Sequence, residues 1–254
     1  MQSLERGLAV IRAFGAGAAE LTLSDVARVT GLTRAAARRF LLTLVDLGYV
    51  RTDGKYFSLS ARVLELGYAF LSSMTLPDVA QPHLERLSAD VRESSSVSVL
   101  EGADIVYVAR VAVSRIMTVT INVGTRFPAH ATSMGHVLLA GLDADGLARY
   151  LERARLDRLT AHTLTSPAAL RAELAKVREQ GWALVDQELE EGLRSVATPI
   201  RDRDGAVVAA INLSTHASRT TREDVLADML PPLLAAAKRI EGDLAVAPAQ
   251  ARRG

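Results

Sequence analysis

The chain has 254 residues, a length typical of two domains or of one large domain. Hydrophobic residues make up 49% and charged residues 23%, values that exclude disorder for most of the chain. No stretch has the roughly 18 uninterrupted apolar residues of a membrane span, and the first residues lack the layout of a signal peptide. These features predict a cytoplasmic protein without membrane contact.

The sequence contains no cysteine, which excludes disulfides, thiolate catalysis and cysteine-containing zinc sites. Basic residues number 30 and acidic residues 29, but their distribution is uneven. Residues 1–60 hold eight basic and five acidic side chains, whereas the remainder holds 22 and 24. This asymmetry suggests a small anion-binding module joined to a larger, slightly acidic domain.

Three helices are predicted within the first 46 residues. Apolar residues recur at helical spacing from Leu4 to Phe14. The run Thr22-Leu23-Ser24-Asp25 has the form of a capping box, and it begins a second helix that Gly31 ends. Thr33 caps a third helix after a turn of about three residues, the spacing of a helix-turn-helix.

The third helix carries the first indication of function. A rotation of 100° per residue turns Ala35, Arg38, Arg39 and Thr43 away from its apolar face. Arginine contacts phosphates or grips guanine in a bidentate fork, and small neighbours let the helix approach a groove. This pattern favours DNA binding, although a solvated helix face would look the same.

Residues 48–59 form two β-rich runs around Asp53-Gly54, the pattern of a β-hairpin. The hairpin places Lys55 near its tip, and a basic tip is typical of the wing of a winged helix-turn-helix. Arg34, Arg38 and Arg39 are expected to recognise DNA, while Thr33, Lys55 and Tyr56 approach its backbone. The predicted interface consists of Thr33, Arg34, Ala35, Arg38, Arg39, Lys55 and Tyr56.

Residues 61–76 predict a linker helix that Pro77 closes. Its apolar side chains could pack on their own domain or on a second copy of the chain, and the second alternative is favoured because a helix-turn-helix usually reads DNA as a dimer. The domain boundaries that follow are 1–60, 61–76 and 77–245, with a flexible tail at 246–254.

The C-terminal domain is predicted to mix helices and strands, so the fold class is α+β with two domains. Strands are expected at 97–100, 105–111, 116–123, 183–185, 196–200 and 207–213. Helices are expected at 83–93, 133–142, 145–154, 167–180 and 222–244. The strand at 116–123 shows the cleanest alternation of apolar and polar residues.

This domain shows no P-loop, no HExxH, no GxSxG and no ligand-spaced histidines, so no catalytic, cofactor or metal site is predicted. A ligand pocket is the remaining option. Its polar wall would come from residues 131–135 at a helix start, from Ser195 and from Asn212 with Ser214. Free amides at the helix start suit a carboxylate, although ordinary caps and a polar strand face would give the same pattern.

Over essentially its full length the sequence resembles the IclR-type transcriptional regulators. The run Ser3-Leu4-Glu5-Arg6-Gly7-Leu8 through the hairpin is similar to their DNA-binding domain. The stretch from Gly181-Trp182-Ala183 to Asp202, with Glu191-Gly192-Leu193-Arg194-Ser195 inside it, resembles their C-terminal signature. Residues 126–135 and 185–190 are most similar to the PcaR- and PobR-like subgroup, which controls aromatic-acid catabolism through protocatechuate and β-ketoadipate.

The resemblance implies a GAF-like C-terminal domain that binds a small organic acid. The pocket positions that it carries onto this chain are Ser133, Met134, Val185, Ser195, Asn212 and Ser214. Three residues depart from the family pattern. Val185 stands where many members carry an acidic residue or serine, Ser195 replaces a frequent cysteine, and Arg201 replaces an aromatic residue or histidine. Val185 is expected to change the polarity of the effector.

An acidic effector needs a positive partner, and Arg126 and Arg194 are the candidates that the sequence offers. The alternative is that they form structural ion pairs with Glu188, Glu190 or Glu191.

The predicted function is transcriptional regulation without enzymatic activity, with protocatechuate, 4-hydroxybenzoate or β-ketoadipate as effector. The expected partners are operator DNA, a second copy of the chain in a homodimer or tetramer, and RNA polymerase if the protein activates. The alternatives are a regulator with a non-aromatic effector, a ligand-independent DNA-binding protein, and an enzyme whose N-terminal helices only dimerise.

Overall fold

The computed structural model describes residues 2–14, 19–66, 75–113 and 121–246. The chain divides into two compact units, Met1–Ser73 and Met74–Gly254. Of the predicted linker helix, residues 63–66 are helical and 67–74 lie outside the described residues. Most of the predicted tail, residues 247–254, also lies outside them.

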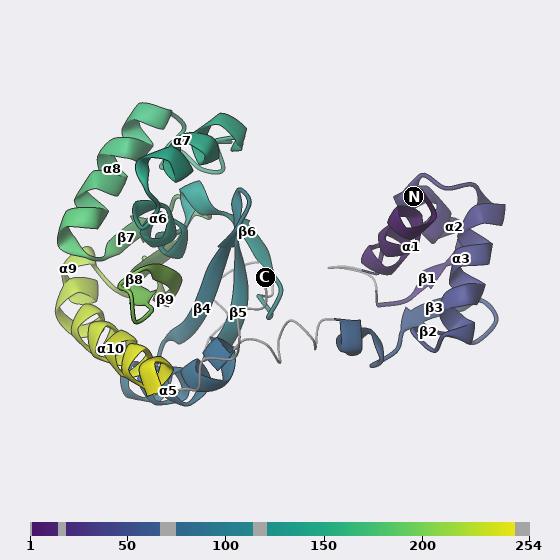
Figure 1. Ribbon diagram of the computed structural model, residues 1–254, viewed down its shortest axis with the longest axis horizontal. Helices are drawn as coiled ribbons and strands as arrows, with labels where there is room; N and C mark the ends of the chain where they lie inside the picture. The colour runs from purple at the N-terminus through teal and green to yellow at the C-terminus, as the bar shows by residue number, and fades with distance from the viewer. Residues whose placement is uncertain (1, 15–18, 67–74, 114–120, 247–254) are drawn as a thin grey trace. The chain divides into compact units, whose positions relative to one another are not determined.

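The first unit contains the three predicted helices, which are α1 (Gln2–Arg12), α2 (Leu23–Thr30) and α3 (Arg34–Asp46) (Figure 1). The predicted capping box begins α2, because Thr22 Oγ1 accepts from Asp25 N at 3.3 Å and Asp25 Oδ2 accepts from Thr22 N at 3.1 Å. The hydrogen bond from the Thr22 side chain lowers the pKa of Asp25. Gly31 ends α2 with φ 67°, a left-handed conformation that favours glycine.

The wing of this unit has the two predicted strands, β2 (Val50–Thr52) and β3 (Tyr56–Leu59), and a third strand that was not predicted. The additional strand, β1 (Leu21–Thr22), pairs with the outer edge of β3, so that the strand order is β1-β3-β2. The sequence could not predict β1, because two residues are too few to show a strand's alternation of apolar and polar side chains. Its partner residues in β3 are also 34 or more positions away. Helices and wing share one core, which includes Val10, Val26, Ala37, Leu41 and Val50.

The second unit is built on a six-stranded antiparallel sheet with the order β6-β5-β4-β9-β8-β7. The strands are β4 (Ser94–Glu101), β5 (Asp104–Val111), β6 (Arg126–Pro128), β7 (Ala183–Asp186), β8 (Leu193–Arg201) and β9 (Val207–His216). The helices are α5 (Thr75–Val91), α6 (Ser133–Ala140), α7 (Ala144–Arg153), α8 (Pro167–Gln180) and α10 (Leu230–Val246).

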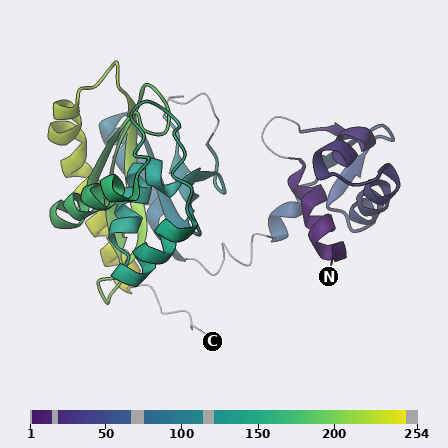
Figure 2. The same ribbon diagram turned by 90° about the horizontal axis from the view of Figure 1, so that it is seen from above.

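Helices cover both faces of this sheet (Figure 1 and Figure 2). One face packs on α5 and α10 through an apolar cluster that includes Val97, Val196 and Leu213. The other face packs on α6 and α8 through Ala197, Ala210 and their neighbours. Because side chains alternate along a strand, consecutive residues belong to different layers. We call the second surface the α6 face.

Two predicted boundaries are wrong. Pro77 does not close a helix, because it lies in the first turn of α5, where its missing N–H costs no intrahelical hydrogen bond. The same helix continues through Pro82. The strand predicted to end at Val123 does not reach it, since residues 121–123 are not strand and the remainder largely lies outside the described residues. The partner of β5 is instead the short β6, which begins at Arg126.

The predicted closing helix is interrupted near its start. It runs as α9 (Arg222–Asp224), a π-helical turn (Val225–Met229) and α10. Pro231 and Pro232 have no N–H to donate to the preceding turn, and Leu230 N bonds to Val225 O five residues back. Within the described ranges, no helix combines the length and apolar character needed to cross a bilayer.

Candidate DNA interface and effector pocket

The predicted recognition surface is exposed on α3. Thr33, Arg34, Ala35, Arg38 and Arg39 are all exposed. Thr33 caps the helix, since its Oγ1 accepts from Ala36 N at 3.2 Å. Within the described part of the chain, none of the three arginines forms an ion pair, so their guanidinium groups are available to phosphates or bases.

The wing holds Lys55 and Tyr56 at an exposed turn. Asp53 Oδ1 accepts from Lys55 N at 2.9 Å and from Tyr56 N at 2.7 Å, and Gly54 adopts φ 98°. The hydrogen bond from Tyr56 N lowers the pKa of Asp53, which keeps this carboxylate ionised and the turn closed. Lys55 Nζ lies 4.9 Å from the centre of the Tyr56 ring. The turn therefore presents a cation next to an aromatic ring.

The α6 face of the sheet brings most of the predicted pocket residues together. Strand register aligns Ser214 on β9 with Ser195 on β8, and Ser195 with Val185 on β7. Ser133, the first residue of α6, reaches this row, with its Oγ 2.8 Å from the Oγ of Ser195. Asn212 Nδ2 donates to Ser214 Oγ at 2.9 Å. These groups come from α6 and three strands and are all buried or half-buried.

Met134 faces the same region, because its Sδ accepts from Ser98 Oγ at 3.2 Å. Thr132 caps α6 by accepting from Gly135 N at 3.0 Å, which fixes where the helix begins. All eight residues of α6 are buried. The start of this helix is therefore fixed against the predicted pocket residues.

Sequence reasoning missed the charged residue of this face, Arg110 on β5. The register aligns Arg110 with Ser96 on β4, and Ser96 with Asn212. Arg110 Nη1 donates to Ser96 Oγ at 3.0 Å, and burial lowers the pKa of Arg110. The run Ser94-Ser95-Ser96-Val97-Ser98 could have indicated a polar sheet face next to Arg110. Ser94, Ser96 and Ser98 alternate along the strand and therefore share one face of the sheet.

Two buried polar atoms on this face have no hydrogen-bond partner among the described residues. They are Nε of Arg110, a donor, and Oδ1 of Asn212, an acceptor, and Asn212 is only 3% exposed. Buried polar groups are normally satisfied, so an unpaired donor and acceptor in neighbouring registers indicate space for a polar ligand or water.

The two predicted arginine partners lie elsewhere. Arg194 precedes Ser195 and so points to the opposite sheet face, where its Nε and Nη2 donate to the two carboxylate oxygens of Asp186, each at 3.0 Å. Arg126 is 43% exposed on β6 and pairs with Glu101 at 2.6 Å and Asp104 at 3.1 Å. The prediction that Arg126 and Arg194 lie in the pocket is therefore wrong. Both form ion pairs, as the alternative expected, but with Glu101, Asp104 and Asp186.

A buried acid–histidine pair joins His136 of α6 to Glu188, which follows β7. Glu188 Oε2 is 4.0 Å from His136 Nε2, and the two side chains are 13% and 1% exposed. Burial raises the pKa of Glu188 to about 7 and lowers that of His136. His136 Nε2 donates to His130 O at 2.7 Å, as a neutral imidazole can. In the described ranges, no three acidic or histidine side chains are grouped as metal ligands.

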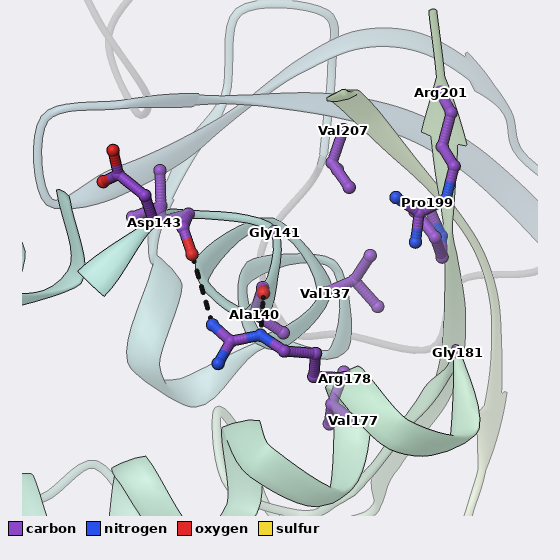
Figure 3. Close-up of a pocket in the computed structure, with 11 residues that line it drawn as sticks. Val137, Ala140, Gly141, Asp143, Val177, Arg178, Gly181, Pro199, Arg201 and Val207 are labelled. Carbon is purple, nitrogen blue, oxygen red and sulfur yellow. Dashed lines mark hydrogen bonds between the residues drawn. The ribbon is translucent and has the colours of Figure 1, made fainter. Parts of the chain in front are cut away.

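A separate cleft of about 330 Å³ lies at the other end of α6 (Figure 3). It is lined by residues of α6, α8 and the β8–β9 hairpin, and it shares none of the predicted pocket residues. Its lining residues include Val137, Val177, Arg178, Pro199, Arg201 and Val207.

A winged helix-turn-helix unit followed by an α/β unit with a polar, partly unsatisfied interior defines a class of protein, the DNA-binding regulator with a ligand-responsive domain. Comparison with known families agrees. Residues 3–54 match the IclR helix-turn-helix domain, and residues 68–242 match the C-terminal domain described as "Bacterial transcriptional regulator IclR C-terminal". The chain belongs to the IclR family of transcriptional regulators.

Characterised relatives include regulators of aromatic catabolism. The chain is 49% identical over 239 residues to the Pca regulon regulatory protein of Pseudomonas putida, covering 94% of this chain and 82% of the relative. It is 38% identical over 235 residues to the p-hydroxybenzoate hydroxylase transcriptional activator of Acinetobacter baylyi, covering 91% and 87%. These relatives are transcriptional regulators and not enzymes.

Solved structures share the fold over nearly the whole chain. A transcriptional regulator from Rhodococcus sp. RHA1 has a TM-score of 0.87 and 61% identity, covering 96% of this chain and 98% of its own. An IclR homologue from Microbacterium hydrocarbonoxydans, in complex with 4-hydroxybenzoate, has a TM-score of 0.84 and 29% identity, covering 95% and 98%.

Proposed function

We propose that this chain regulates genes of aromatic-acid breakdown in response to a small aromatic acid bound on the α6 face. Protocatechuate and 4-hydroxybenzoate are the first candidates, with β-ketoadipate as a non-aromatic acid of the same route. The observation that carries this proposal is the pair of unpartnered buried atoms, Arg110 Nε and Asn212 Oδ1, which lie in one cross-strand row with Ser96 between them, in a family whose relatives control aromatic catabolism.

The two unpaired atoms suit the two polar ends of such a ligand. Arg110 supplies a fixed positive charge, already oriented by Ser96, for a carboxylate. Asn212 Oδ1 needs a donor, which a phenolic hydroxyl supplies. Ser133, Ser195 and Ser214 supply further hydroxyls at the α6 side of the site. Val185 leaves that wall partly apolar, as an aromatic ring requires.

On the DNA side, Arg34, Arg38 and Arg39 would enter the major groove, where the small Ala35 allows a close approach. Thr33, Lys55 and Tyr56 would contact the DNA backbone. We infer a homodimer, or a tetramer of two dimers, because paired helix-turn-helix units read two half-sites. Contact with RNA polymerase would follow if the protein activates. A regulator of this kind acts in the cytoplasm, where the operator DNA is.

The test is binding to the DNA upstream of the chain's own gene, measured by fluorescence anisotropy with and without each candidate acid. We expect at least one acid to change operator affinity or footprint, since a ligand acts only through different affinities for two states. If no aromatic acid alters operator binding but another acid does, the chain is a ligand-responsive regulator whose effector is not aromatic. Operator binding without any ligand response would favour a ligand-independent DNA-binding protein.

The pocket is tested with Arg110→Gln. We expect a loss of at least about tenfold in effector affinity, because the carboxylate loses its charged partner, with operator binding unchanged. Arg126→Gln is the matched control, since this arginine is held by Glu101 and Asp104 outside the pocket. Equal losses in both variants would mean that net charge, and not a contact from Arg110, governs binding.

A further inference from the structure

We propose that the cleft at the C-terminal end of α6 is a second binding site, for a small organic carboxylate with an apolar body. This site does not depend on the proposed effector pocket. The effector positions Ser133 and Met134 begin α6, whereas the cleft uses Val137, Ala140 and Gly141 at the end of that helix. The buried residues Leu138, Ala197 and Ala210 belong to the core cluster that α6 shares with the sheet, and none of them lines the cleft.

The floor of the cleft is apolar. Val137 is 2% exposed and Val177 is 3% exposed, and Pro199 and Val207 complete the lining from the β8–β9 hairpin. The approach of the hairpin to α6 is close, because a Cβ on Gly141 would lie 2.6 Å from Val207 Cβ. A volume of about 330 Å³ lies within the range of small-molecule sites and accommodates an aromatic ring.

Two arginines stand at the rim, and both are held in position. Arg178 Nε donates to Ala140 O at 2.9 Å and its Nη2 donates to Leu142 O at 3.2 Å, so it also neutralises the carbonyl end of α6 (Figure 3). Arg201 Nη1 donates to Gly205 O at 3.0 Å. Each guanidinium keeps further N–H donors, and a fixed guanidinium loses little entropy when it binds a carboxylate.

The charge of the rim selects for an anion. Among the described residues, Asp143 is the one acidic residue that lines the cleft, and its Oδ1 accepts from Gly146 N at 2.6 Å as the cap of α7. Its carboxylate points away from the centre of the cleft (Figure 3). Two cations above an apolar floor fit a carboxylate attached to a ring or an alkyl chain better than an inorganic anion.

The experiment is equilibrium dialysis of the full chain with labelled benzoate, fitted for the number of sites. Val207→Trp fills the cleft, and Val208→Trp is its matched control, because Val208 is the next residue of β9 and does not line the cleft. We expect Val207→Trp to remove one site per chain and Val208→Trp to retain it. An isotherm of Val207→Trp that overlaps the wild type would overturn the proposal.

Charge is tested with Arg201→Gln against Arg203→Gln, which removes the same charge from the same hairpin outside the cleft. We expect about tenfold weaker benzoate binding in the first variant and no change in the second. Equally weakened benzoate binding in both variants would mean that the net charge of the hairpin, and not a contact from Arg201, governs binding. If inorganic phosphate displaced all of the bound benzoate, the apolar floor would have no role in binding.

The two proposed sites fail in distinguishable ways. If the effector pocket does not bind benzoate, Val207→Trp abolishes all binding. If the cleft does not bind benzoate, Arg110→Gln weakens the one remaining site by at least about tenfold, and Val207→Trp changes nothing.

Discussion

At the scale of single residues, the exposed arginines of α3 give the first prediction. Arg38 has no ion pair among the described residues, so its guanidinium is available to DNA. Arg38→Ala should weaken specific operator binding by about 1–3 kcal/mol if it reads a base, and should lower the salt slope by about one if it holds a phosphate. Arg86→Ala, an exposed arginine of the second unit, is the control. Unchanged affinity and slope would remove Arg38 from the interface.

Glu188 gives a pH-dependent prediction at the same scale. Burial raises its pKa from 4.5 to about 7 in the folded protein, so between these values the unfolded chain ionises while the folded one stays protonated. Ionisation of Glu188 therefore costs no folding stability below about pH 4.5, and the free energy of unfolding falls as the pH rises to about 7, by about 3 kcal/mol in all.

Glu188→Gln should remove this loss and stabilise the protein above pH 7, as measured by urea denaturation at several pH values. Glu191→Gln, at an exposed position in the same loop, should leave the pH profile unchanged. His136 has the opposite effect on stability. Because burial lowers its pKa in the folded protein, the unfolded chain takes up a proton first as the pH falls below the usual pKa of histidine, and the folded state loses stability. A Glu188→Gln variant with the wild-type pH profile would contradict the assignment.

At the scale of elements, α6 depends on one glycine. A Cβ on Gly135 would lie 2.0 Å from Ala129 O, a backbone atom that cannot rotate away. Gly135→Ala should therefore shift the start of α6, lower stability by about 3 kcal/mol or more, and abolish effector binding. Thermal melting and effector titration check this.

Gly242 is the control for this substitution, because an added Cβ there meets nothing within 4 Å. Gly242→Ala should be neutral or slightly stabilising, since alanine favours a helix. A stable Gly135→Ala variant with normal effector binding would show that the turn at Ala129–Ala131 can move freely.

At the scale of the whole molecule, the chain consists of two compact units with separate cores. An effector that binds only the second unit should stabilise that unit, by about 2.7 kcal/mol at a hundredfold excess over Kd. Calorimetry of the full chain without DNA should then show one transition that shifts with effector and one that does not. A single transition that shifts as a whole would mean that the units unfold together.

The sequence by itself determined the local structure and the class of protein. The capping box at Thr22, the cap at Thr33, the Asp53-Gly54 turn and the helix from Pro167 to Gln180 depend on side chains a few residues apart, so their signals are contiguous. The family resemblance rests on motifs that are contiguous in the same way, and the family assignment confirms it.

Only the tertiary structure decided which polar residues share the α6 face, where we propose the effector pocket. Strand register aligned Ser96 with Arg110 on the next strand of the chain and with Asn212 more than 100 positions later, and one step along β8 separated Ser195 from Arg194. The sequence predicted Arg194 in the pocket and did not indicate Arg110, because which side of a strand faces α6 depends on how the whole sheet packs. A shift of one residue in that pairing exchanges the two faces of the sheet, so the pairing as a whole decides which side chains meet on one face.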